Sequence, residues 1–149
     1  MIRTSQILAT LVAVLLSLSV HADAVWDTPS AKALPEDVAE LISGEQYEQA
    51  IVELENFIQS EKRNADAWNL LGYSQRKLGL LDESLVSYKK ALKLDRKHPG
   101  AHEYIGELYL TMGDPKKAKK HLKKLEKYCK DCDELIELAK AIEKYEQGS

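Results

Sequence analysis

The sequence predicts an all-α protein built from stacked helical hairpins and closed by one further helix. Three observations lead to this fold class. The composition is rich in Leu, Ala, Glu and Lys and has only one Phe and seven Gly, which favours helix over sheet. Apolar residues recur at three- and four-residue steps, and the pattern of one hairpin returns after 34 residues. A length of 149 residues suits a single domain.

The first 22 residues have the three parts of a secretory signal peptide. Arg3 supplies a positive start, an apolar run extends from Ile7 to Val20, and small residues follow at Ala22 and Ala24. Cleavage after either alanine satisfies the small-residue rule. A membrane anchor is the weaker alternative, because about 14 apolar residues are too few to cross a bilayer core of roughly 30 Å. We therefore expect an exported protein in an oxidising compartment.

The segment after the signal peptide leads into a degenerate first repeat at residues 31–64. Residues 23–34 have no sustained period and are expected to form an extended N-terminal arm, in which Trp26 covers an edge of the first helices. A helix is predicted from Pro35 to the residue before Gly44, because proline suits a first turn and glycine suits a helix end. The next helix is predicted over residues 46–60 from its single apolar face.

The clearest hairpin spans residues 65–98. Trp68, Leu71 and Gly72 share one face of its first helix, Gly79 ends that helix, and Asp82 is placed to cap the second. The same pattern returns in residues 99–132. A capping helix is predicted over residues 133–147, and its apolar positions are Leu135, Ile136, Leu138, Ala139 and Ile142.

These residues carry a resemblance to a known family. The pattern Trp68-x2-Leu71-Gly72, followed by Ser84-x3-Tyr88-x2-Ala91 with a period of 34 residues, resembles the tetratricopeptide repeat. The resemblance implies a right-handed α-solenoid of about three hairpins plus the capping helix. Gln75 stands where the family usually has an aromatic residue, and Arg96 stands where proline often ends the unit.

The packing pattern has a physical reason beside the resemblance. Gly72 and Gly106 leave room for a neighbouring helix to approach. The small residues Ala50, Ser84 and Ala118 let paired helices cross closely.

One stripe of the first helices is not needed for this packing. The resemblance implies that these helices line a concave groove in which extended peptides or partner helices bind. An ordinary solvated helix face is the alternative. The lysine-and-asparagine clamp that some family members use for a C-terminal carboxylate is not found on these helices. The candidate partner-binding residues are Asp66, Asn69, Tyr73 and Arg76 in one repeat and Glu103, Glu107 and Leu110 in the next.

Cys129 and Cys132 are the only two cysteines and lie where the last repeat meets the capping helix. In an exported chain this pair is expected to form a disulfide that holds the corner. A redox site is the alternative, but redox Cys-x-x-Cys pairs usually open a helix in a βαβ unit. A metal site would need further ligands, and the nearest candidate, His121, is two helical turns away, so no metal is predicted.

A basic stretch of eight lysines runs from Lys116 to Lys130. A solvated face is the favoured interpretation, and contact with a membrane surface is a less favoured one. No aromatic residues are interleaved, and the formal net charge is −3, so nucleic-acid binding is not predicted. His98 and His102 are interpreted as a turn residue and a replacement for the repeat's tryptophan.

No catalytic constellation emerges, because there is no Gly-rich phosphate loop and no nucleophile elbow. We expect a non-enzymatic, monomeric scaffold or adaptor without a cofactor, located in the periplasm or secreted, that binds a protein or peptide through the concave face. The alternative function is a thiol-redox or metal- or cytochrome-maturation factor that uses Cys129 and Cys132.

Overall fold

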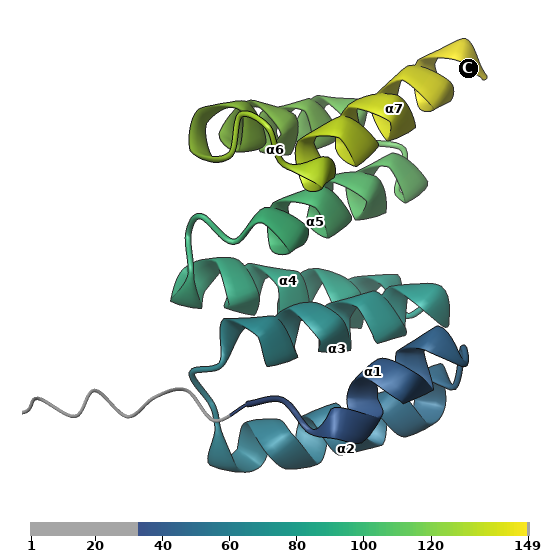
Figure 1. The fold of residues 1–149 in the computed structure, drawn as a ribbon. Coiled ribbons are helices and arrows are strands. Elements are labelled where there is room, and N and C mark those ends of the chain that lie inside the picture. Colours follow the sequence, from purple (N-terminus) through teal and green to yellow (C-terminus); the bar gives the residue numbers. More distant parts are fainter. Residues whose placement is uncertain (1–32, 149) are drawn as a thin grey trace, which may run out of the picture.

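The computed structural model describes residues 33–148, and the predicted signal peptide and Trp26 lie outside these residues. Within this range the chain forms helices and no strand (Figure 1). The helices are α1 (Glu36–Ser43), α2 (Tyr47–Ser60), α3 (Ala65–Lys77), α4 (Leu81–Leu94), α5 (Pro99–Thr111), α6 (Pro115–Tyr128) and α7 (Asp133–Gln147). The helices predicted over residues 35–43, 46–60 and 133–147 correspond to α1, α2 and α7, whose ends lie within one residue of the predicted ones.

The helices pair in sequence order and the pairs stack. Helices α1 and α2, α3 and α4, and α5 and α6 form three hairpins, and α7 packs against both helices of the third (Figure 1). The first hairpin and the α6–α7 end lie at opposite ends of the stack. No helix between residues 33 and 148 combines the length and the apolar character that a membrane crossing needs.

Side chains cap the starts of three helices. Asn64, His98 and Asp114 each accept a hydrogen bond from the backbone N–H three residues further on, at 2.9, 3.1 and 3.0 Å. These contacts satisfy N–H groups that lack partners inside the helix. The predicted cap at Asp82 is wrong. This residue lies in the first turn of α4, where its charge favours the helix dipole, and Leu80 occupies the cap position without a side-chain bond.

The turns within the second and third hairpins depend on glycine. Gly79 and Gly113 have φ angles of 78° and 75°, which lie in the left-handed region. Side chains with a Cβ atom rarely adopt this conformation. Each glycine lets the chain reverse immediately after the first helix of its hairpin, as the sequence predicts.

Two further glycines allow close helix contact. A Cβ atom at Gly72 would lie 2.8 Å from the Tyr88 ring, and one at Gly106 would lie 2.6 Å from Leu138. Both distances are too short for unbonded carbon atoms, so the absence of a side chain is required. Gly72 therefore receives its partner from α4, whereas Gly106 receives its partner from α7.

The core runs along the stack in two clusters of buried residues. Val38, Leu54 and Leu71 belong to the cluster formed by α1, α2 and α3, so the first hairpin packs directly on the second. The second cluster joins α4 through α7 and includes Leu125 and Leu138. Ala50, Ser84 and Ala118 are fully buried, as expected for positions where paired helices cross closely. Ile136, predicted as apolar packing, is exposed on α7.

The candidate binding face on α3 and α5

Four of the predicted binding residues meet on one surface, which we call the α3–α5 face. It consists of Tyr73 and Arg76 from α3 and Glu103 and Glu107 from α5, all half-buried. Helices α3 and α5 belong to neighbouring repeats and contact each other directly. The face is therefore assembled only when two repeats stack.

Tyr73 and Tyr104 bring half-buried rings to this face, and the ring of Tyr47 on α2 lies buried beside Tyr73, with 8% of its surface exposed. The ring centroids of Tyr47 and Tyr73 are 6.2 Å apart, and those of Tyr73 and Tyr104 are 5.1 Å apart. Both spacings lie in the range of favourable aromatic contact. Tyr104 was not among the predicted site residues, because it directly follows Glu103 and so lies off the stripe of three- and four-residue steps. Its aromatic type beside that stripe was the available signal.

An ion pair crosses the face. The guanidinium of Arg76 lies 2.7 Å from the carboxylate of Glu107, and both side chains are largely shielded from solvent. The same guanidinium lies 5.6 Å from the centroid of Tyr73 and 5.8 Å from that of Tyr104. A planar cation can pair with a carboxylate and contact aromatic faces at the same time. Arg76 is therefore held in place by both repeats.

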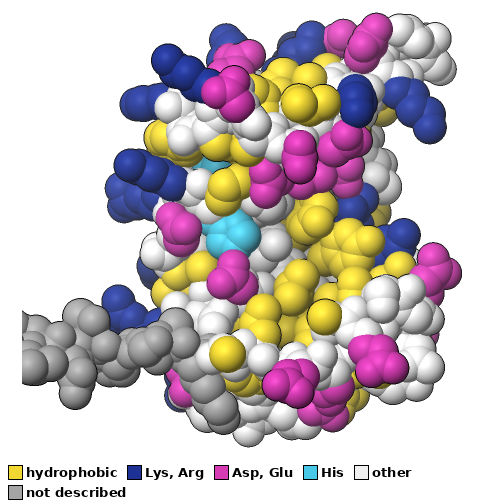
Figure 2. All heavy atoms as spheres, viewed as in Figure 1, with side chains coloured by type: hydrophobic (Ala, Val, Ile, Leu, Met, Phe, Trp, Pro, Cys, Tyr) yellow, Lys and Arg dark blue, Asp and Glu magenta, His cyan; other side chains and the backbone are white. Residues whose placement is uncertain are grey.

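Glu103 is the half-buried acid of this face. Burial, followed by the nearby carboxylates Glu107, Glu134 and Glu137, raises its pKa to about 7, although Arg76 opposes this rise. No ion pair involves Glu103 among residues 33–148. Figure 2 shows acidic side chains gathered where α5 meets α7, beside an apolar patch.

The other three predicted site residues lie differently. Asp66 is exposed near the start of α3, and its carboxylate lies 3.0 Å from Nε2 of His98. The accessible positions expected for Asn69 and Leu110 are not observed, because only 5% and 8% of their surfaces are exposed. Asn69 packs against Gly100 of α5, and its Oδ1 accepts no hydrogen bond. Leu110 belongs to the core cluster of α4 through α7.

A histidine pair lies away from this face, between α5 and α6. The Nδ1 atoms of His102 and His121 are 2.9 Å apart, and Nε2 of His102 lies 3.1 Å from the Arg96 carbonyl oxygen. Because that Nε2–H donates to the carbonyl, His102 Nδ1 accepts a hydrogen bond from the Nδ1–H of His121. Burial lowers the pKa of both histidines, that of His121 to about 4. His102 thus fills the tryptophan position of its repeat, as predicted.

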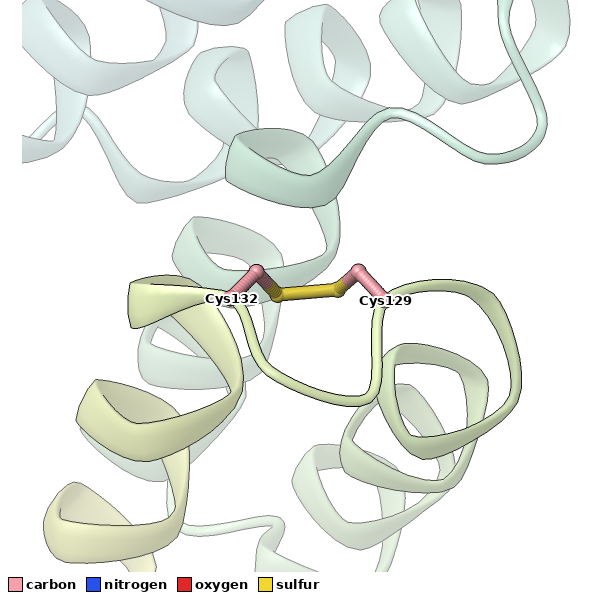
Figure 3. Close-up of a disulfide and its surroundings, with 2 residues drawn as sticks. All are labelled: Cys129 and Cys132. Atoms are coloured by element: carbon pink, nitrogen blue, oxygen red, sulfur yellow. A yellow bond between two sulfur atoms is a disulfide. The ribbon is translucent and has the colours of Figure 1, made fainter.

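Cys129 and Cys132 face each other at disulfide distance between α6 and α7 (Figure 3). Both side chains are half-buried against the core cluster. The pair therefore joins the last repeat to its capping helix at the predicted corner. In the described part of the chain, no group of three or more His, Cys, Asp or Glu side chains is arranged to hold a metal ion.

The lysines from Lys116 to Lys130 are all exposed, and Ala118 and Leu125 are buried beneath them. Lys117 pairs with Asp114 and Lys119 pairs with Glu146. The other six have no ion pair within the described residues. The predicted arrangement of an apolar inner face and a basic outer face is confirmed.

Stacked antiparallel helix pairs with a closing helix define an α-helical repeat protein, an α-solenoid. The chain belongs to the tetratricopeptide repeat family. Sequence profiles described as tetratricopeptide repeat match residues 65–98 and 104–132. These matches and the fold confirm the resemblance inferred from Trp68, Leu71 and Gly72.

Solved structures of similar fold support the assignment. The first TPR domain of Spaghetti (RPAP3), bound to an HSP90 peptide, has a TM-score of 0.68 at 16% identity, covering 77% of this chain and 89% of that one. The type III secretion translocator chaperone SycD of Yersinia enterocolitica has a TM-score of 0.65 at 18% identity, covering 74% and 84%.

MamA from Desulfovibrio magneticus RS-1 has a higher identity, 26%, with a TM-score of 0.60. The alignment covers 64% of this chain and 54% of the MamA chain, so this chain spans about half of that structure's length. No curated protein sequence matches the chain.

Proposed function

We propose that this protein is an exported scaffold that binds a protein or peptide partner through the α3–α5 face, acting as the concave face of the repeats. The observation that carries the proposal is the pair of half-buried rings of Tyr73 and Tyr104, joined to the cross-repeat pair of Arg76 and Glu107. Its function is binding without catalysis.

The chemistry of the face suits peptide recognition. Tyrosine and arginine are enriched among residues that contribute most to binding, because each combines contact area with a polar group. Arg76 is held between two rings and a carboxylate, so little further side-chain entropy is lost when a partner binds. A partner segment lying across α3 and α5 would contact both repeats.

Proteins of similar fold support this proposal. Spaghetti is seen with an HSP90 peptide, and SycD is described as a translocator chaperone. At identities of 16% and 18%, these neighbours support polypeptide binding as the kind of function and do not identify the particular partner.

A peptide library tests the proposed face. Random peptides displayed on phage would be selected on the wild-type chain and then measured against Tyr73→Ala and against Lys89→Ala, an exposed position on α4. We expect at least tenfold weaker binding to Tyr73→Ala and unchanged binding to Lys89→Ala. Peptides that bind both variants equally, or a selection that yields no binder, would contradict the proposal.

We also propose export to the periplasm, with Cys129 and Cys132 as a stable structural disulfide. The pairing of the two cysteines at the α6–α7 corner supports this role. N-terminal sequencing of protein from the cell envelope should begin at Asp23 or Val25. Free-thiol titration of the same material separates the two functions, because reduced thiols or a bound metal would favour the thiol or metal-handling alternative.

A further inference from the structure

We propose that the protein associates end to end with a second copy of itself, α2 of one molecule lying against α6 of the next. The contact is electrostatic and therefore depends on protein concentration and on salt. At low concentration the chain remains the expected monomer. The inference uses surfaces outside the α3–α5 face and does not depend on peptide binding there.

One end of the stack is uniformly acidic. Residues 33–61, which form α1, α2 and their flanks, contain eight acidic side chains and no basic one. None of these carboxylates forms an ion pair within the described chain. Along α2, Glu48, Val52, Glu55 and Gln59 recur at four-, three- and four-residue steps and are all exposed. The acidic surface is thus an ordered stripe along one helix.

The opposite end is basic. Residues 115–130 contain eight lysines and one glutamate. Lys116, Lys120, Lys123 and Lys127 recur at the same four-, three- and four-residue steps, and all are exposed. None of the four forms an ion pair within residues 33–148. Figure 2 shows lysines clustered at the α6 end of the molecule.

The two stripes match in length as well as in charge. Helices α2 and α6 each have 14 residues, which corresponds to about 21 Å at the usual rise per residue. Val52, which is 54% exposed, lies between Glu48 and Glu55 on its stripe. A lysine from a second copy could place its aliphatic stem on this valine while its ammonium group reaches a flanking carboxylate. A stripe that places an exposed valine between two carboxylates therefore suits a lysine side chain better than a stripe of carboxylates alone would.

Each copy of the chain carries both complementary surfaces. Because the two surfaces cannot meet within one molecule, a second copy offers each of them its complement. The first hairpin and α6 lie at opposite ends of the stack (Figure 1). Pairing different surfaces of two copies leaves one acidic end and one basic end free, so further molecules can add. The association should therefore lengthen with concentration rather than stop at a symmetric dimer. Surface charges are screened within about 8 Å at physiological ionic strength, so added salt should weaken the contact.

Sedimentation velocity on the exported chain tests the proposal. At high protein concentration and about 20 mM salt, we expect the average mass to rise above that of the monomer and to return to it at about 500 mM salt. Lys120→Glu/Lys123→Glu should abolish the rise, and so should Glu48→Lys/Glu55→Lys. The matched control is Lys89→Glu/Lys93→Glu, which makes the same change of charge on exposed positions of α4 and should still associate.

Mixing the two reversed variants gives the decisive measurement. The first variant keeps the wild-type acidic stripe of α2 and the second keeps the wild-type basic stripe of α6, so each should remain a monomer alone and the equimolar mixture should associate. A wild-type chain that stays monomeric at low salt would overturn the proposal. Association of either reversed variant alone, or a mixture that stays monomeric, would overturn it as well.

Discussion

Arg76 on α3 and Glu107 on α5 form an ion pair of 2.7 Å that ties neighbouring repeats together across the candidate binding face. The pair neutralises one of the carboxylates that surround Glu103. It also holds the guanidinium between Tyr73 and Tyr104. A single contact therefore contributes to the stacking of repeats, to the charge of the face and to the position of its aromatic rings.

Replacing Arg76 with Ala should destabilise the stack by about 1–3 kcal/mol. The change leaves the partly buried Glu107 carboxylate without its partner and removes the packing of the guanidinium on two rings. Urea unfolding followed by circular dichroism measures the loss.

Lys140→Ala is the matched control, because it breaks the pair with Glu137 between two exposed side chains. Exposed ion pairs contribute little to stability, so the control should behave as the wild type does. Equal losses in the two variants would show that the Arg76 pair has no special role.

Glu103→Gln should stabilise the protein above pH 7 and have little effect near pH 4.5. Burial raises the folded-state pKa of Glu103 to about 7, from an ordinary value of 4.5. Between these values the folded chain retains a proton that the unfolded chain has released, so stability falls as pH rises. Glutamine removes this loss.

The gain at pH 8 should be about 1 kcal/mol, because half-exposure and solvent screening reduce the effect. Urea midpoints of both proteins at pH 4.5 and pH 8 give the comparison. A Glu103→Gln variant with the same advantage at both pH values would refute the titration account. Glu134→Gln, at a neighbouring carboxylate on α7, serves as a control with a smaller expected pH effect.

The helix pattern could be predicted from the sequence because it depends on local apolar periodicity and on Gly79 and Gly113, which follow the ends of helices. The burial of each helix face by neighbouring helices could not be predicted. Asn69 is polar and lies on the stripe predicted to be accessible, yet it is buried because Gly100 lets α5 approach it closely. Leu110 is likewise buried in the core formed by α4 through α7. Both outcomes depend on a neighbouring repeat, which periodicity within one helix does not describe.

The candidate face was likewise predicted only in part. Tyr73, Arg76 and Glu107 were predicted because their spacing places them on one stripe of each helix. Tyr104 was missed because it directly follows Glu103 and so lies off the predicted stripe of three- and four-residue steps. The ring instead lies beside Tyr73, since a long aromatic side chain can reach from a position between two helices to the edge of the face.

Gly106→Ala should cost about 1–3 kcal/mol through overpacking. A Cβ atom there would lie 2.6 Å from the side chain of Leu138, which is fully buried on α7. The capping helix must therefore shift, and thermal unfolding should show a lower Tm. Thr111→Ala, at an exposed position of the same helix, is the control. If Leu138→Val relieves part of the loss in the double variant, the contact itself is the cause, whereas fully additive losses would contradict this explanation.

In the Glu103→Gln background, the protein should lose stability as pH falls from 6.5 toward 4, because of the histidine pair. Burial lowers the folded-state pKa of His121 to about 4 and also lowers that of His102, and Lys124 adds to both effects. In this window the unfolded chain binds protons that the folded chain excludes, so stability rises with pH. The geometry agrees, because only one proton fits between the two Nδ1 atoms at 2.9 Å.

His121→Gln should reduce this dependence, since glutamine does not titrate and can still donate to His102. Urea unfolding at half-unit steps from pH 4 to pH 7.5 would give the slope, followed by the fluorescence of Trp68. The measurement belongs in the Glu103→Gln background, because Glu103 titrates in an overlapping window with the opposite sign. We expect a shallower slope, with about 1 kcal/mol less loss at pH 4.5 after allowing for solvent screening. An unchanged slope would mean that other groups cause the acid sensitivity and that His121 binds its proton equally well in the folded and unfolded chains.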